Sequence, residues 1–239
     1  MKKIRVIVVD DERSSREELK SMLKDYPDFE LTGEARNADE AKELIEAKCP
    51  DLIFLDIQMP EKNGFELLES LNQVPAVIFT TAFNQYAVQA FEANALDYLV
   101  KPIREERFAK TIEKVRSSIS HQLNADKTFS NDRQIFIKDG EKCFFVWLSE
   151  IFLIESLDNY SKLYFLDKKV VLKRSLKQWE EILDNEHFFR INRTQVVNTC
   201  HVREIYSSSK SRLKISLKTG QLLEVSGRQS VRFRNMNGI

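Results

Sequence analysis

The segment Leu52-Ile53-Phe54-Leu55-Asp56-Ile57-Gln58-Met59-Pro60 is the most informative about the fold of the first half of the chain. Its four leading residues are all apolar, without the alternation of a half-exposed strand. Such a run is typical of a short strand buried on both faces, as in a parallel sheet. The strand ends in a carboxylate, so Asp56 is expected at the edge of that sheet.

Similar runs lie on both sides of this stretch, and helical segments separate them. The other apolar runs are Ile4–Val9, Ala76–Phe79, Tyr98–Val100 and a weaker one at Phe29–Leu31. The segments with helical spacing are 14–24, Ala38–Ala47, Phe65–Leu71, Gln85–Phe91 and Arg104–Ile119. Five strand–helix alternations predict an α/β fold, a doubly wound five-stranded parallel sheet with right-handed crossovers.

After residue 120 the pattern changes. A polar, poorly periodic segment at 121–133 predicts a linker between a first domain, 1–120, and a second, 134–236. A capping box at Ser175–Gln178 predicts a helix that runs to about Leu183. The second domain is expected to be mostly β, with short strands at Ile135–Ile137, Cys143–Trp147, Ile151–Glu155, Lys162–Leu166 and Val170–Lys173 and a hairpin at 211–225.

Composition limits the function classes. The chain has 239 residues and no apolar run near the roughly 20 residues that cross a bilayer. The N-terminal apolar run is too short for a secretory segment and ends in Asp10-Asp11-Glu12, which predicts a cytoplasmic protein without a membrane partner. The three cysteines are scattered, which favours reduced thiols. Residues 1–124 hold 17 Lys and Arg against 23 Asp and Glu, whereas residues 125–239 hold 20 against 14. An acidic half joined to a basic half suggests two different partners, with nucleic acid a candidate for the basic one.

Functional side chains follow the predicted strands of the first half. In doubly wound sheets, ligands bind beyond the carboxyl ends of the strands. Three carboxylates, a hydroxyl and a lysine are expected to meet there, namely Asp10, Asp11, Asp56, Thr81 and Lys101. Crowded carboxylates favour a hard cation such as Mg²⁺. A carboxylate such as Asp56 can attack phosphorus, and Lys101 can supply positive charge to the phosphoryl oxygens.

The first half resembles a response-regulator receiver domain, a flavodoxin-like fold. The resemblance covers residues 1–120, and it rests on the motifs Val9-Asp10-Asp11-Glu12, Leu55-Asp56-Ile57-Gln58-Met59-Pro60 with Gly64, Phe79-Thr80-Thr81-Ala82 and Asp97-Tyr98-Leu99-Val100-Lys101-Pro102. As a set with these spacings, the motifs are specific to that family.

The resemblance implies a role for each matching residue. Asp56 would accept a phosphoryl group from a sensor histidine kinase. Mg²⁺ would be bound by Asp11, by Asp10 partly through water, by Asp56, and by the backbone carbonyl of Gln58. Thr81 and Tyr98 would be a switch pair that responds to phosphorylation, and Lys101–Pro102 would be a cis peptide.

The second half resembles the LytTR DNA-binding domain. The resemblance rests on Ile154-Glu155-Ser156, Lys173-Arg174-Ser175-Leu176, Phe188-Phe189-Arg190-Ile191-Asn192-Arg193, Val197-Asn198 and Leu222 to Arg228. It implies base-reading loops with Asn159 or Tyr160, Arg193 and Arg228, and supporting contacts from Lys162, Arg174 and Arg190. Asn192 is also expected to bind DNA, although the family usually has His at this position. Asn198 is either a DNA contact or a structural residue.

Together the halves predict a phosphorylation-controlled transcriptional regulator that forms a homodimer on activation and binds promoter DNA. An alternative is a signalling module whose basic half docks a protein or RNA. An output enzyme is disfavoured, because the second half shows no nucleophile–base pair, metal cluster or phosphate-binding loop.

Overall fold

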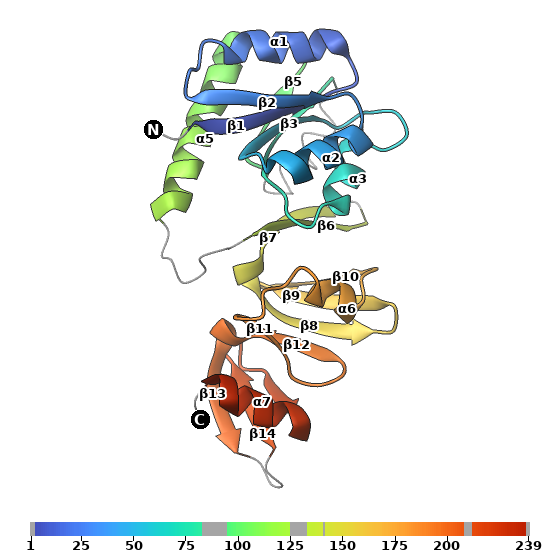
Figure 1. Cartoon of the computed structure of the whole chain (residues 1–239), viewed down its shortest axis with the longest axis vertical. Helices are drawn as coiled ribbons and strands as arrows, with labels where there is room; N and C mark the ends of the chain where they lie inside the picture. The colour runs from blue at the N-terminus through green and yellow to red at the C-terminus, as the bar shows by residue number, and fades with distance from the viewer. Residues whose placement is uncertain (1–2, 83–94, 125–132, 141, 208–211, 238–239) are drawn as a thin grey trace. The chain divides into compact units, whose positions relative to one another are not determined.

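The computed structural model describes residues 3–82, 95–124, 133–140, 142–207 and 212–237, which fall into two compact units, Met1–Phe145 and Val146–Ile239 (Figure 1). The helix expected at Gln85–Phe91 and the linker residues 125–132 lie outside the described residues. Residues 121–124, also expected in the linker, continue the last helix of the first unit. Among the described residues, no helix is both long and apolar enough to cross a membrane.

The first unit is built on a parallel sheet whose strand order is β2-β1-β3-β4-β5. All four neighbouring pairs are parallel, as the sequence predicts. The weakly apolar β2 is an edge strand, which explains its weak signal, because most of its residues are not buried. The strands are β1 (Ile4–Val9), β2 (Phe29–Ala35), β3 (Leu52–Asp56), β4 (Ala76–Thr81) and β5 (Asp97–Val100).

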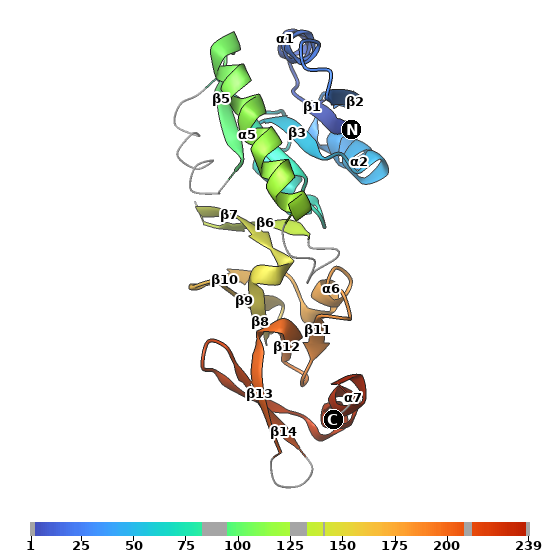
Figure 2. The same ribbon diagram turned by 90° about the vertical axis from the view of Figure 1, so that its left-hand side faces the viewer.

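Helices cover both faces of this sheet (Figures 1 and 2). Apolar side chains of α1 and α5 form one buried cluster with one face of the sheet, and those of α2 and α3 form another with the opposite face. Side chains cap two of these helices, since Asn37 accepts from the backbone of Glu40, and Asn63 and Glu66 form a capping box. The helices are α1 (Arg13–Leu23), α2 (Ala38–Lys48), α3 (Gly64–Ser70) and α5 (Glu105–Asn124).

A two-stranded sheet packs on the α3 side of the first unit. The ring of Phe136 stacks on that of Phe65, with centroids 6.0 Å apart, and Phe145 lies 6.4 Å from Phe79 of β4. The sequence pattern groups these strands with the second domain, but Phe136, Cys143 and Phe145 belong to the core of the first unit, which ends within β7. The strands are β6 (Gln134–Asp139) and β7 (Lys142–Trp147).

The second unit is mostly β, as expected, and contains a five-stranded sheet in the order β10-β9-β8-β12-β11 and a three-stranded sheet in the order β13-β14-β15. Buried residues of both sheets and Phe233 of the last helix form one apolar core. The strands are β8 (Ile151–Leu157), β9 (Tyr160–Phe165), β10 (Lys168–Leu172), β11 (Phe188–Arg190), β12 (Gln195–Asn198), β13 (Val202–Ser207), β14 (Leu213–Leu217) and β15 (Leu222–Val225).

Short helices complete the second unit. The predicted capping box begins α6 (Leu176–Glu180), which ends three residues before the expected Leu183. Trp179 of α6 is fully buried, and its indole nitrogen donates to Ser161 Oγ at 2.7 Å. The elements expected from the sequence do not include α7 (Gly227–Asn237), the strands β11 to β13, or the one-turn helices η1 (Leu148–Glu150) and η2 (Thr199–His201).

Candidate functional site

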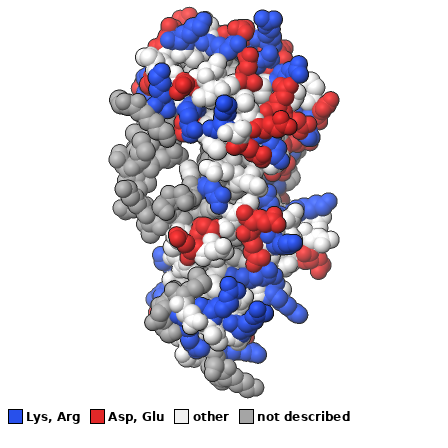
Figure 3. All heavy atoms as spheres, in the orientation of Figure 1, with Lys and Arg blue, Asp and Glu red and all other residues white. Residues whose placement is uncertain are grey.

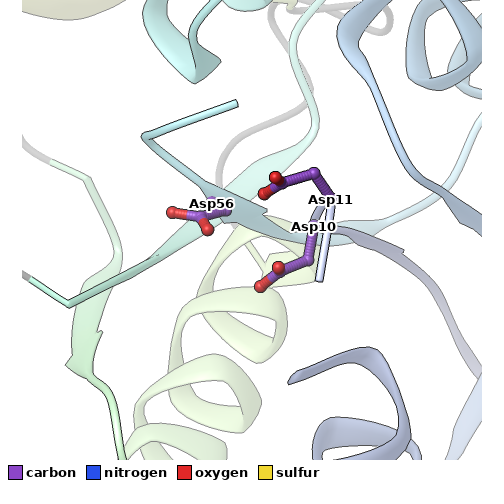
Figure 4. A group of neighbouring side chains, drawn as sticks. All are labelled: Asp10, Asp11 and Asp56. Carbon is purple, nitrogen blue, oxygen red and sulfur yellow. The ribbon is translucent and has the colours of Figure 1, made fainter. Parts of the chain in front are cut away.

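Three carboxylates meet at one edge of the parallel sheet (Figure 4). Asp10 and Asp11 follow β1, and Asp56 ends β3, which pairs directly with β1. One carboxylate oxygen from each of the three lies within 4.8 Å of the others. Asp10 and Asp56 are buried and Asp11 is exposed. This set of hard oxygen donors fits a divalent cation such as Mg²⁺, with the exposed Asp11 leaving the site open to solvent.

Lys101 lies between the two buried carboxylates. Its Nζ is 2.7 Å from Oδ2 of Asp10 and 2.7 Å from Oδ2 of Asp56. The lysine follows β5, and its backbone N–H donates to the carbonyl of Thr81 at the end of β4. The Lys101–Pro102 peptide is cis, as the family resemblance implies. The sheet therefore brings together the acceptor candidate and the cation from residues 45 positions apart in the chain.

Burial governs the protonation of this site. Desolvation raises the pKa of Asp10 to about 6, although Lys101 acts in the opposite direction. Burial likewise raises the pKa of Asp56, again against the effect of Lys101. Two buried carboxylates that share one lysine carry an excess of negative charge, and a bound cation would remove the penalty of that charge.

The loop after β3 holds Asp56 in place. The backbone N–H of Gln58 donates to Oδ1 of Asp56 at 3.1 Å, and the N–H of Gly64 donates to the carbonyl of Ile57. A Cβ on Gly64 would lie 2.5 Å from the carbonyl oxygen of Asp56, a contact that real side chains do not make. Glycine at this position lets α3 begin directly against the candidate acceptor.

The candidate switch residues lie on the two adjacent strands β4 and β5. Thr81 is buried at the end of β4, one residue after Thr80, which pairs with Asp56. Tyr98 is half-buried on β5, where its carbonyl accepts from Arg107 at 2.8 Å and its ring lies 5.8 Å from the Arg107 guanidinium. Arg107 is a residue that the sequence analysis did not single out, since a lone arginine on a helix carries no recognisable pattern.

A buried acid anchors Arg107. Asp97 accepts from Arg107 at 2.6 and 2.7 Å, from Thr111 at 2.6 Å and from Lys114 at 3.0 Å. Burial alone would raise the pKa of Asp97, but these hydrogen bonds outweigh it and lower the pKa to about 2. The charged form of Asp97 is therefore favoured by the folded state, and it fixes the guanidinium that contacts Tyr98.

We expect Asp97→Asn to destabilise the protein by about 2 kcal/mol at neutral pH, because the depressed pKa is worth about that much. A depressed pKa gives stability that is present above the unfolded value near 4 and is lost as the pH falls toward 2. Urea denaturation at several pH values, followed by circular dichroism, measures the difference. The exposed Asp39→Asn variant is the control, and a wild-type advantage that persists unchanged at pH 2 would contradict the prediction.

In the second unit, three loops meet at one end of the five-stranded sheet. Tyr160 pairs with Leu157 across the β8–β9 turn, and the neighbouring β8 residue Ser156 donates from its backbone N–H to the carbonyl of Thr194. The N–H of Ser226, just before α7, donates to the carbonyl of Ile191. The candidates Asn159, Tyr160, Arg193 and Arg228 are thus brought to the same end of the unit, and all four are exposed.

The remaining candidates of this half are more enclosed. The guanidinium of Arg174 lies 4.8 Å from the centre of the Trp179 ring, and burial lowers the pKa of Arg174. Lys162 Nζ lies 5.3 Å from the centre of the Tyr164 ring. The side chain of Arg190 bonds to Glu180 and to the carbonyl of Arg193, and the side chain of Asn192 bonds to Gln195. Asn198 is buried and its side chain bonds to the backbone of Ile151 and Cys200, which fits a structural role.

Charge is unevenly distributed on the second unit. In the space-filling view, Lys and Arg side chains gather on its lower part, whereas the first unit shows both signs (Figure 3). A basic surface of this kind attracts the phosphate backbone of nucleic acid.

Comparison with known proteins identifies both halves. Residues 6–113 match the family model of the response regulator receiver domain, and residues 141–238 match that of the LytTr DNA-binding domain. The chain belongs to the LytTR family of response regulators. This response regulator is therefore a phosphorylation-controlled DNA-binding regulator of transcription. Its second domain binds DNA and is not an enzyme domain. Its partners are a histidine kinase and DNA. The match of the second half decides against the protein-docking or RNA-binding alternative.

Similar proteins align with nearly the whole chain, and a similar solved structure covers its first half. The sensory transduction protein LytT of Bacillus anthracis is 33% identical over 233 residues, which cover 93% of this chain and 94% of the relative. The transcriptional regulatory protein LytR of Staphylococcus aureus is 29% identical over 231 residues, with the same coverage. The response regulatory domain of protein mrkE from Klebsiella pneumoniae superposes with a TM-score of 0.46 at 30% identity, covering 49% of this chain and 99% of that structure.

Proposed function

We propose that Asp56 accepts the phosphoryl group from the histidine kinase and that this strengthens sequence-selective binding of duplex DNA by the second unit. The observation that carries the proposal is the position of Lys101 Nζ, 2.7 Å from an oxygen of Asp56 and 2.7 Å from an oxygen of Asp10. Receiver function resides in residues 1–120 and DNA recognition in residues 134–236, joined by residues 121–133. The proposed site of action is the cytoplasm, where the DNA lies.

Phosphoryl transfer needs an exposed route, a nucleophile and charge compensation. A carboxylate oxygen of Asp56 forms a bond to phosphorus while the P–N bond to the kinase histidine breaks, and the electron pair of that bond leaves with the imidazole nitrogen. Lys101 already contacts Asp56 and is placed to donate to the phosphoryl oxygens. Mg²⁺, when bound, would neutralise part of the charge on the phosphoryl group. Asp10, Asp11, Asp56 and the carbonyl of Gln58 would hold it.

The same site supports self-phosphorylation and hydrolysis with small phospho-donors, because the acceptor, the lysine and the metal ligands all belong to this chain. Thr81 is the proposed hydroxyl donor to the new phosphoryl group, since it directly follows Thr80, the residue of β4 that pairs with Asp56. Movement of Thr81 changes the space behind it, into which Tyr98 of the adjacent strand β5 can turn. The pair is the proposed switch.

Dimerisation is the proposed output of the switch. When two receivers pair, the second DNA contact becomes effectively intramolecular, so the avidity for a two-site promoter rises without any new DNA contact. Sedimentation velocity with and without Mg²⁺ and beryllofluoride, a phosphoryl mimic, measures the change in oligomeric state directly.

The function as a whole is tested by DNA binding. We expect the affinity for a duplex selected from a random pool to rise about tenfold or more when Mg²⁺ and beryllofluoride are added at fixed salt. Fluorescence anisotropy of the labelled duplex measures it, and the affinity should fall steeply with added salt because several phosphates are contacted. Selective binding that is indifferent to the mimic would remove the proposed coupling, and Asp56→Asn is the matched control.

A further inference from the structure

Residues 191–194 connect β11 to β12 and carry Arg193, whose side chain is exposed and takes part in none of the ion pairs among the described residues. A flexible arginine on a flexible loop gains little from contacting a base, because ordering both costs conformational entropy. The groups that hold this loop therefore decide how well Arg193 can discriminate between bases.

One of these groups is Asn192. Its Nδ2 donates to Oε1 of Gln195 at 2.8 Å and to the carbonyl of Glu224 at 3.2 Å. Its Oδ1 accepts from the backbone N–H of Thr194 at 2.9 Å and from the Thr194 hydroxyl at 3.1 Å. An asparagine side chain has two donors and two acceptor positions, and here all four are filled within the protein. Asn192 has no hydrogen bond left for a base.

The bonds of Asn192 reach beyond its own loop. Gln195 donates to Glu155 Oε1 at 2.7 Å, and the other carboxylate oxygen of Glu155 accepts from the hydroxyl of Tyr164 at 2.5 Å. Glu155 thus anchors the loop to β8 and β9. The bond to Glu224 ties the same loop to the end of β15, four residues before Arg228.

The second group is Arg190, whose side chain bonds to the backbone of the loop. Its Nε donates to the carbonyl of Asn192 at 3.2 Å and its Nη2 donates to the carbonyl of Arg193 at 2.7 Å. Its Nη1 lies 3.2 Å from Oε2 of Glu180 on α6. The planar guanidinium therefore bridges two consecutive loop carbonyls and a carboxylate, a geometry that a fixed fork of donors can satisfy and a lysine cannot reproduce.

From these contacts we infer that Arg190 and Asn192 form a clamp that positions Arg193 relative to Arg228, and that neither residue itself contacts DNA. The clamp acts on sequence selectivity, because it fixes where the Arg193 guanidinium can reach. The inference rests on the proposal that Arg193 contacts DNA, and it changes the role that the family resemblance suggests for Arg190 as a supporting DNA contact and for Asn192 as a DNA-binding residue.

The test compares two duplexes of equal length and composition, one selected from a random pool and one with the shuffled sequence, each titrated with the full chain at several salt concentrations. For Asn192→Ala and Arg190→Gln we expect the ratio of the two affinities to fall roughly tenfold, within the range that one arginine–base contact supplies. We expect the affinity for the shuffled duplex and the dependence on salt to stay unchanged. Thermal unfolding of each variant checks that it is folded.

Glu180→Gln is a milder variant, since Glu180 is part-exposed and its loss leaves the loop itself intact. Removing a negative charge near DNA would by itself raise the affinity for both duplexes equally. The clamp predicts instead a lower ratio, because Arg190 loses its anchor. An equal rise for both duplexes with an unchanged ratio would contradict the clamp. Glu181→Gln removes the same charge from the neighbouring exposed residue, which is not part of the clamp, and is the control for charge alone.

Two other results would overturn the inference. If Arg190→Gln weakens both duplexes equally and lowers the salt dependence by about 0.9 in the logarithmic slope, Arg190 is a phosphate contact. If the ratio is unchanged in Arg190→Gln and Asn192→Ala but collapses in Arg193→Gln, Arg193 reads DNA without the clamp. If Arg193→Gln also leaves the ratio unchanged, the proposed Arg193 contact is wrong, and the clamp fails with it.

Discussion

Asp56→Asn is expected to abolish phosphorylation of the protein. Asparagine keeps the size of the side chain and can still accept from the backbone N–H of Gln58, but its amide is not a nucleophile toward phosphorus. Incubation with acetyl phosphate and Mg²⁺, followed by intact-mass measurement, should show one added phosphoryl group on the wild type and none on the variant. The gain in DNA affinity with the phosphoryl mimic should disappear as well.

The control for this experiment is Asp39→Asn, which removes an exposed carboxylate that pairs with Lys62. Asp39→Asn should incorporate phosphate as the wild type does. A phosphoryl group that persists in Asp56→Asn would contradict the assignment. Peptide mapping would then show whether the buried neighbour Asp10 had accepted it.

Lys101→Met is expected to slow phosphorylation of Asp56 by about 100-fold at saturating Mg²⁺. The loss of one preorganised group that stabilises the negative charge of a transition state typically has an effect of this size. The same variant should bind Mg²⁺ more tightly than the wild type. Lys101 is the cation between two buried carboxylates, and without it their charge is left for the metal to neutralise. The variant should therefore have a lower phosphorylation rate but a higher affinity for Mg²⁺.

Initial rates with acetyl phosphate measure the first effect, and the rise of the melting temperature with added Mg²⁺ measures the second. Lys62→Met, which removes an exposed lysine from a surface ion pair, is the matched control and should change neither. A normal phosphorylation rate in Lys101→Met would show that Lys101 has only a structural role.

Much of the first unit follows from local sequence. Unbroken apolar runs such as Leu52–Leu55 predict buried parallel strands, and the rule that ligands bind beyond the carboxyl ends of strands then places Asp10, Asp56 and Lys101 together. The structure confirms that grouping. The contacts of Arg107 with Tyr98 and Asp97 were not predicted, because they depend on how α5 packs beside β5.

In the second unit, the local capping signal was predicted from the sequence but the short strands were not. The capping box at Ser175 is local, so it could be recognised and is confirmed, whereas β11 and β12 are three- and four-residue strands stabilised by pairing with each other and, for β12, with β8. A strand that short has no periodicity to detect. The charges of Arg190 and Arg193 are visible in the sequence, but their different environments are not.

Residue types, their order and their short-range spacing were enough to predict the two-domain plan, the acidic site of the first domain and the basic, mostly β character of the second. The folded structure was needed to show which polar groups are already hydrogen-bonded within the protein. Asn192 and Arg190 bond to Glu224 and Glu180, residues distant in sequence, and Lys101 lies between Asp10 and Asp56. Such partnerships depend on strand order and loop packing, so no local pattern of residues encodes them.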